Sequence, residues 1–276
     1  MVRYRKPWLY RCVGCGFLRS TFSPEIRDEA ARAAVDEPLR ARALNALRPA
    51  NFELLLDRLS TVLDPAGKHL LDVGSAHGWF LDAAAARGFS ATGLEPDPAV
   101  AHLAAQDGRR VWQGFFPDDV PQDASFDAIT FNDVFEHLPE LDVAISACRR
   151  LLRPGGILVL NNPSSAGIFY RVASLLDRLG IPGPLERMWQ MRFPSPHLSY
   201  FTPDRMKRFA ERSGFTEIHR STLPSVRLGG LWARLQLDRH SSPLMNLPIW
   251  LGVAAVRPFL GLLPADATLQ FFRRSD

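Results

Sequence analysis

The fold is decided by one stretch, Leu70-Leu71-Asp72-Val73-Gly74-Ser75-Ala76-His77-Gly78-Trp79-Phe80-Leu81. Its apolar beginning predicts a strand over 69–73, and the alanine-rich segment after it predicts a helix over 79–87. The glycines between them allow a ligand to approach the backbone closely, and the free N–H groups of a helix N-terminus favour a polar or anionic group there. The stretch therefore indicates a ligand-binding turn at the carboxyl end of a strand, although an ordinary strand–helix turn shows the same pattern.

Glu95 strengthens the ligand-binding interpretation. It follows a second predicted strand, 90–94, and lies 21 positions after Gly74. A carboxylate about 20 residues beyond a glycine turn can accept hydrogen bonds from a ribose diol. The alternative is a surface acid in the turn before Pro96. Together, the turn and the acid favour a ligand that contains adenosine.

Strands and helices continue to alternate after this point. Further strands are predicted over 110–113, 126–132 and 156–161, and helices over 97–105 and 140–152. Strands separated by helical patterns indicate βαβ units and a parallel sheet. Downstream, we expect helices over 168–179 and 203–213, a loop or lid over 180–196, and strands over 215–220 and 267–273.

Three regions follow from this pattern. Residues 1–63 would form an N-terminal knuckle and a helical cap, because 25–63 reads as helices with an apolar stripe from Phe52 to Leu63. Residues 64–222 would form the ligand-binding domain, with a lid at 164–202. Residues 223–276 would add an apolar helical segment and a final strand that completes the sheet.

Composition excludes several classes of protein. The chain has 276 residues, enough for one large α/β domain with additions, and its formal net charge is only +4, which disfavours nucleic acid as a partner. Three cysteines argue against a disulfide framework, and the basic first ten residues do not resemble a signal peptide. No segment reaches the roughly 20 apolar residues of a spanning helix, so we expect a cytoplasmic protein.

Several motifs together resemble the class I S-adenosylmethionine-dependent methyltransferases. Residues 71–78 resemble the first motif of that family, Asp-x-Gly-x-Gly-x-Gly, with the small residue Ala76 at the middle glycine. Three later segments resemble further family motifs in the same order: 93–97, 126–139 and 151–156. Residues 197–203 and the Cys12-x-x-Cys15-Gly16 knuckle are similar to one broad bacterial subgroup. The resemblance implies a Rossmann-like, doubly wound α/β fold with a seven-stranded sheet, an antiparallel last strand, and helical N- and C-terminal decorations.

The resemblance also implies S-adenosyl-L-methionine as the cofactor, bound by the domain 64–222. Asp72 and Gly74 would form the floor under the methionine moiety. Ser75 and Gly78 would line the turn around it. Glu95 would accept hydrogen bonds from both ribose hydroxyls.

Four later residues would complete the cofactor site by the same resemblance. Gly114 and Phe115 stand where the family places the adenine ring. Asn132 and Asp133 would point toward the amino group and the reaction centre. Both residue types also suit a helix N-cap, and that role stays open as an alternative.

His137 is the expected general base. In methyl transfer the cofactor supplies the reactive carbon, and the protein supplies alignment and, where needed, a base. His137 follows the fourth predicted strand, and histidine titrates near neutral pH. Glu136 has similar claims, and a structural role is the alternative for both. His197 and Tyr200 would reach the site from the lid or simply order that loop.

Two segments are left outside this assignment. Cys12 and Cys15 have the spacing of half a zinc site, but no second pair follows, so we expect no metal and favour a turn stabilised by glycines. Residues 241–264 are apolar but interrupted by prolines and Arg257. They indicate either peripheral membrane contact or, as the favoured interpretation, a packed cap over the substrate cleft or a dimer face. Either one suggests a lipophilic acceptor.

The expected function is methyl transfer from S-adenosylmethionine to an oxygen, nitrogen or carbon of a small-molecule or lipid-linked acceptor. A nicotinamide-dependent oxidoreductase is one alternative, but it gives no role to Glu136-His137 or to Pro154-Gly155-Gly156. A non-catalytic cofactor-binding module that docks on a membrane or partner is the other. The oligomeric state stays open.

Overall fold

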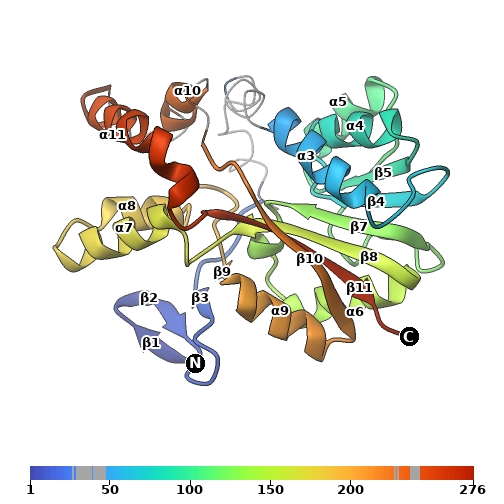
Figure 1. Cartoon of the computed structure of the whole chain (residues 1–276), viewed down its shortest axis with the longest axis horizontal. Coiled ribbons are helices and arrows are strands. Elements are labelled where there is room, and N and C mark those ends of the chain that lie inside the picture. Colours follow the sequence, from blue (N-terminus) through green and yellow to red (C-terminus); the bar gives the residue numbers. More distant parts are fainter. Residues whose placement is uncertain (27, 29–38, 40–47, 227, 229, 237–242) are drawn as a thin grey trace.

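A seven-stranded sheet forms from the strands that the alternating pattern predicts. This computed structural model describes residues 1–26, 28, 39, 48–226, 228, 230–236 and 243–276. The strands are β4 (His69–Val73), β5 (Ser90–Glu95), β6 (Val111–Gln113), β7 (Phe126–Asn132), β8 (Leu152–Pro163), β10 (Phe215–Leu223) and β11 (Ala267–Arg274). Their order across the sheet is β10-β11-β8-β7-β4-β5-β6 (Figure 1).

The direction in which the chain adds strands to the sheet reverses at β4. From β4 the chain runs outward through β5 and β6, then returns to place β7 on the other side of β4, and all of these pairs are parallel. The strand β11 is antiparallel to both of its neighbours, β10 and β8. The predicted seven-stranded, doubly wound fold with one antiparallel strand is therefore confirmed. Such a reversal leaves a ligand site at the carboxyl ends of the strands on either side of it.

Two strands are longer than the sequence predicts. The strand β8 begins at Leu152, before the predicted start at 156, and β10 continues to Leu223, past the predicted end at 220. The glycines at the beginning of β8 concealed its first residues, because glycine is depleted in strands generally.

Helices cover both faces of this sheet. One face carries α6 (Leu141–Leu151) and α9 (Pro203–Arg212), and the other carries α3 (Arg48–Ser60) and α4 (Trp79–Ala86). Successive strand residues point to opposite faces, so Leu71 packs in the first core and Leu70 in the second. The predicted stripe on α3 is confirmed: Phe52, Leu55, Leu56 and Leu59 are buried. The helix expected before Arg48 lies mostly outside the described residues.

The first 20 residues form a small sheet that the sequence did not predict. They form β1 (Val2–Tyr4), β2 (Lys6–Arg11) and β3 (Leu18–Ser20), which join β9 (Ser199–Tyr200) in a second, antiparallel sheet. No local pattern predicts this sheet, because its strands are short and β3 pairs with a segment far along the chain, through Leu18 and Tyr200. The cysteine segment is the turn between β2 and β3: Gly16 N–H donates to the Cys12 carbonyl at 2.8 Å, and both thiols are free.

The lid is more ordered than a loop. It contains α7 (Ile168–Arg178) and, inside the segment predicted as loop, α8 (Gly183–Met188). A third core forms where the lid meets the N-terminal sheet, and its members include Leu9, Leu18, Tyr170, Trp189 and Tyr200. The prediction of a loop over 180–196 is wrong at α8, because Leu185 in this helix and Trp189 directly after it are buried in the third core.

The C-terminal apolar segment stands away from the sheet (Figure 1). It comprises α10 (Leu231–Gln236), α11 (Pro243–Val256) and a 3-10 helix, Arg257–Leu262. Leu231 and Leu235 of α10 are buried, but several large side chains of the later helices face solvent; Leu244 is 88% exposed and Leu262 is 86% exposed. Within the described part of the chain no helix has both the length and the apolar character that a membrane crossing requires.

Candidate active site

The glycine turn lies at the carboxyl end of β4, where the winding reverses. Gly74 and Gly78 both have left-handed backbones, with φ of 71° and 77°. A Cβ atom on Gly74 would lie 2.6 Å from a Val134 methyl carbon, and one on Gly78 would lie 2.4 Å from Cδ of Arg109. Both positions therefore require glycine for conformation and for space, as the sequence pattern implied.

Glu95 holds this turn from the neighbouring strand. Its carboxylate accepts one hydrogen bond from the Ala76 N–H at 2.8 Å and another from the Asp97 N–H at 2.9 Å. Ala76 itself is left-handed, with φ of 47°, which explains why the related motif has glycine there. Each carboxylate oxygen can accept a further hydrogen bond, so holding the turn is compatible with contact to a ribose hydroxyl.

Buried polar atoms without a partner gather at the carboxyl ends of three strands. They are Ser75 Oγ after β4, Asn132 Oδ1 at the end of β7 and Asn161 Oδ1 near the end of β8, and none has a hydrogen-bond partner among the described residues. Asn132 and Asn161 are paired in register. Unpaired buried polar atoms are costly and point to an absent polar ligand. S-adenosylmethionine fits this requirement, because it carries amino, carboxylate, hydroxyl and adenine groups.

Asp72 lies inside the sheet beneath the turn. Its Oδ1 accepts hydrogen bonds from Thr130 Oγ1 at 2.6 Å and from Asn132 Nδ2 at 3.0 Å. Burial raises the pKa of Asp72 to about 7, and these two hydrogen bonds oppose that rise. Asp72 thus orients Asn132, which excludes the N-cap interpretation of Asn132; the following 3-10 helix, Phe135–His137, has Val134 at its N-cap and no side-chain cap.

The remaining predicted cofactor residues lie at the same edge of the sheet. Gly114 follows β6 and donates its N–H to the Glu95 carbonyl at 3.0 Å. The Phe115 N–H donates to Asp119 at 2.7 Å, an aspartate that the sequence did not single out. Asp133 follows β7, is exposed, and has a left-handed backbone with φ of 55°.

Glu136, His137 and His197 form a cluster of titratable side chains near this edge. The Nε2 atoms of both histidines lie 3.9 Å from Oε1 of Glu136. Glu136 is buried, and neither of its carboxylate oxygens has a hydrogen-bond partner among the described residues. Burial, reinforced by the charge of Asp133, raises its pKa well above the ordinary glutamate value. The lid and β7 thus contribute to one site, as the Leu198 N–H also shows by donating to the Glu136 carbonyl at 2.9 Å.

The two histidines have different roles, which their hydrogen bonds reveal. His137 Nδ1 lies 2.9 Å from the carbonyl of Pro196, which can only accept, so Nδ1 carries the proton and Nε2 keeps its lone pair in the neutral ring. His197 Nδ1 contacts the Tyr200 hydroxyl at 3.1 Å, and that hydroxyl donates to the Met188 carbonyl. The remaining nitrogen of His197 lies 2.9 Å from Gln190 Nε2. His197 therefore connects two parts of the lid, while Nε2 is the nitrogen of His137 that carries no proton in the neutral ring.

Three potential ligand atoms in this cluster lie within 4.8 Å of one another, a spacing compatible with a metal ion. Both nitrogens of His197, however, are already engaged with Tyr200 and Gln190. A metal ion would have to displace the Gln190 amide before it could bind there. Burial and the neighbouring His137 lower the pKa of His197 well below its usual value, so it is neutral.

Arg48 is a residue that sequence reasoning did not connect with this site. It begins α3, and its positive charge opposes the rise in the pKa of both Asp72 and Glu136. No local pattern distinguishes it among the 33 lysines and arginines of the chain. Only the packing of α3 against the sheet brings it to the site.

Comparisons with known proteins agree with this geometry. Over 127 residues the chain is 35% identical to a ubiquinone biosynthesis O-methyltransferase of Xanthomonas oryzae pv. oryzae. The aligned segment covers 44% of this chain and 52% of the relative. Over 125 residues it is 34% identical to an uncharacterized methyltransferase of Mycobacterium sp. strain JLS, covering 44% and 50% respectively. The chain thus matches about half the length of each of these relatives.

Solved structures share the fold. A cyclopropane synthase from Mycobacterium tuberculosis is similar with a TM-score of 0.56 at 17% identity, over 82% of this chain and 83% of that one. An S-adenosylmethionine-dependent methyltransferase from Mesorhizobium loti is similar with a TM-score of 0.52 at 18% identity, over 79% and 96%. At these identities the likeness establishes the fold alone.

Residues 44–220 match the family profile described as methyltransferase domain, a segment that runs from α3 through most of β10. This match sets aside the nicotinamide-dependent oxidoreductase. The turn at Gly74, the acid Glu95 and the edge of β7 all lie within the matched segment. The chain belongs to the methyltransferase domain family.

Proposed function

We propose that the chain transfers the methyl group of S-adenosylmethionine to a hydroxyl oxygen of a small-molecule or lipid-linked acceptor, with His137 as general base. The observation that carries this proposal is the orientation of His137. Its Nδ1 is held by the Pro196 carbonyl at 2.9 Å, so Nε2 is the nitrogen that can accept a proton. A hydroxyl needs such a base because it is a weak nucleophile until it loses its proton.

Glu136 would support the base electrostatically. Burial raises the pKa of Glu136, because its negative charge is poorly solvated there. A nearby cation would therefore stabilise this anion more than it would stabilise an exposed carboxylate. An imidazolium at His137, with Nε2 3.9 Å from Glu136 Oε1, would supply that cation as the acceptor proton arrives. When bound, the cofactor supplies the electrophilic methyl carbon, and the protein supplies alignment and this proton acceptor.

The turn residues would hold the cofactor. We assign Glu95 to the ribose hydroxyls, and Gly74, Ser75 and Gly78 to the backbone surface around the methionine moiety. The positive φ of both glycines and the unpaired hydroxyl of Ser75 support this assignment.

Residues at the ends of the later strands would complete the cofactor site. Gly114 and Phe115 would flank the adenine, and Asn132 and Asp133 would face the amino group. Asp72 would act through Asn132 as a positioning residue, because its carboxyl oxygen binds the Asn132 amide at 3.0 Å. Arg48, whose charge acts on both Asp72 and Glu136, would offer a positive charge for the methionine carboxylate.

The acceptor side supports a lipophilic substrate. The favoured interpretation of residues 241–264, a packed cap, leaves unexplained why Leu244, Leu247 and Leu262 are exposed. The helix α11 is apolar over most of its residues, and exposed apolar patches of this kind mark surfaces that bind a membrane or another protein. We therefore propose that this segment rests on lipid and gives the site access to a lipid-linked acceptor. The name of the ubiquinone biosynthesis relative is compatible with an apolar acceptor.

Methyl transfer can be tested with labelled S-adenosylmethionine and three probe acceptors: catechol, an alkylated catechol and an aromatic amine. We expect the catechols to be methylated and the alkylated one to be preferred. His137→Gln should lower kcat by about 100-fold or more while the Kd for S-adenosylmethionine stays within about twofold. The matched control is His219→Gln on β10, whose imidazole contacts Ser221 at 2.8 Å. Full turnover in His137→Gln, or a preference for the amine, would contradict the proposal; cofactor binding without turnover on any acceptor would favour the non-catalytic module.

Membrane contact can be tested by flotation with phosphatidylcholine vesicles. Leu247 on α11 and Leu103 on α5 (Pro98–Gln106) are each 50% exposed, so they form a matched pair. Leu247→Glu should abolish co-flotation, and Leu103→Glu should leave it unchanged. Co-flotation that survives Leu247→Glu, or that is absent in the unsubstituted protein, would reject the lipid contact and favour a dimer face or a cap.

A further inference from the structure

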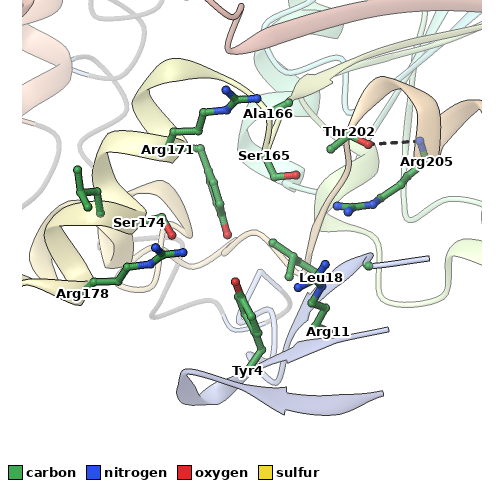
Figure 2. A pocket seen from close by; sticks show the side chains of 13 residues that line it. Tyr4, Arg11, Leu18, Ser165, Ala166, Arg171, Ser174, Arg178, Thr202 and Arg205 are labelled. Atoms are coloured by element: carbon green, nitrogen blue, oxygen red, sulfur yellow. Dashed lines mark hydrogen bonds between the residues drawn. The ribbon is translucent and has the colours of Figure 1, made fainter. Parts of the chain in front are cut away.

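A cavity of about 400 Å³ lies outside the methyl-transfer site, between the N-terminal sheet, α7 and the beginning of α9 (Figure 2). Leu18 and Tyr170 line it, and both belong to the third core. The rings of Tyr170 and Tyr200, another member of that core, stand 4.7 Å apart. None of the residues assigned to the cofactor or to the base lines the cavity, so the proposed catalytic chemistry does not use it.

The lining of this cavity carries positive charge. Four arginines line it, Arg11, Arg171, Arg178 and Arg205, and its lining contains no acidic residue. Across the described residues, none of these four arginines forms an ion pair within 4 Å. The nearby Asp177 is already paired with Lys6 at 2.6 Å. Since lysines and arginines exceed acids by only four over the whole chain, this is a marked local excess of charge.

The fold brings two of these guanidinium groups together at the cysteine turn. Gly16 has a left-handed backbone, and a Cβ placed on it would lie 2.5 Å from a guanidinium nitrogen of Arg205 and 3.3 Å from one of Arg11. Arg11 also lies over the Tyr4 ring, 5.4 Å from its centroid. The last glycine of the cysteine motif thus makes room for two like charges at one edge of the cavity. Their mutual repulsion is relieved by an anion between them.

Hydroxyl groups also line the cavity. They belong to Ser165, Ser174 and Thr202. The Ser165 hydroxyl donates to the Phe201 carbonyl at 3.1 Å, and Arg5 donates to Ser174 Oγ at 3.1 Å. In Figure 2 the side chains of Arg178 and Arg205 approach the cavity from opposite sides. A planar guanidinium group can donate hydrogen bonds to two oxygens of a phosphate at once. Several guanidinium groups around one cavity therefore suit a phosphate or diphosphate, which has many oxygens, better than they suit a single carboxylate.

We propose that this cavity binds the phosphate or diphosphate group of a ligand, held by Arg11, Arg178 and Arg205. The N-terminal sheet, which the methyl-transfer proposal leaves without a role, supplies one wall of the site. A phosphate on the headgroup of a lipid and one on a soluble ester present the same chemistry to these arginines. The site stands independently of the assignment of His137.

The first experiment measures binding of inorganic pyrophosphate to the full chain by calorimetry at about 150 mM salt, where exposed charges are screened. We expect one saturable site. Arg205→Gln should weaken it by about 10- to 100-fold, the range for hydrogen bonds to a charged group. Arg208→Gln, a matched change on the same helix α9 outside the lining, should leave the affinity within about twofold. Arg178→Gln on the opposite wall should repeat the loss, which keeps the test valid if Arg205→Gln fails to fold.

The second experiment distinguishes the two sources of the phosphate. Phosphatidylcholine vesicles with and without phosphatidic acid are compared with glycerol 3-phosphate in solution. Binding that depends on Arg205 and appears only with phosphatidic acid identifies a lipid headgroup, and binding of the soluble ester identifies a free phosphate ester. No saturable binding of any probe, or equal losses in Arg205→Gln and Arg208→Gln, would overturn the proposal. None of these readouts uses S-adenosylmethionine, so they fail or succeed apart from the proposed enzyme activity.

Discussion

Replacing Glu95 with alanine tests the cofactor turn most directly. In the structure its two carboxylate oxygens accept from the N–H groups of Ala76 and Asp97, and we assign the ribose hydroxyls to the same oxygens. A charge-assisted hydrogen bond contributes about 1.5–3 kcal/mol. Losing it on binding should therefore raise the Kd for S-adenosylmethionine by about 10- to 150-fold.

The same change also affects stability. Without the carboxylate, the buried Ala76 loses the acceptor of its N–H, which costs about 1–3 kcal/mol of unfolding free energy. Affinity should therefore be measured by isothermal titration calorimetry at a temperature where circular dichroism shows the variant to be folded. Only then does the change in Kd report on the ribose contact.

Asp97→Ala is the matched control for this experiment. Asp97 is two residues away and caps α5, where its Oδ1 accepts from the Ala99 N–H at 2.9 Å. Losing this cap should cost about 1 kcal/mol of stability and change the Kd for S-adenosylmethionine by less than about threefold. If the folded Glu95→Ala variant also binds within about threefold of the unsubstituted chain, our assignment of Glu95 to the ribose is wrong.

Two further predictions concern the same turn. Burial raises the pKa of Asp72 to about 7, above its ordinary value of 3.8, so the folded state binds the proton more tightly and the unfolding free energy falls as pH rises from about 4 to about 7. Asp72→Asn should remove up to about 4 kcal/mol of that fall in urea titrations across this range, leaving the part due to Glu136; an unchanged slope would contradict the shift. Ala76→Gly should stabilise the chain by about 0.5–1 kcal/mol in thermal unfolding, because φ at Ala76 is 47°, whereas Ala85→Gly within α4 should destabilise it by about as much. Destabilisation by Ala76→Gly would show that the left-handed turn is not strained.

The apolar tail shows where tertiary structure changed an interpretation. A proline-broken apolar segment suits both a packed cap and a membrane-facing element, since composition is the same for both. In the structure Leu244 and Leu262 are almost fully exposed, so the described part of the chain does not cover them. The choice between a packed cap and a membrane-facing element depends on which residues surround each side chain, and the local sequence does not contain that information.

The sequence by itself determined the order of strands and helices, the glycine turn and the acid Glu95. Each depends on signals that are local in the chain: the period of apolar residues, the left-handed turns at Gly74 and Gly78, and the short spacing between adjacent βα units. Such features persist whatever the rest of the chain does, and the seven-stranded sheet followed from them.

Only the tertiary structure decided which histidine resembles a base, where Arg48 lies and what the first 20 residues form. His137 is oriented by Pro196, 59 positions away, and Ser20 donates to the carbonyl of His197, 177 positions away. Of the short strands β1–β3, β3 pairs with β9 in the lid, about 180 positions along the chain. Contacts at such separations depend on how all the elements pack, and packing is a property of the whole chain that no stretch of residues contains alone.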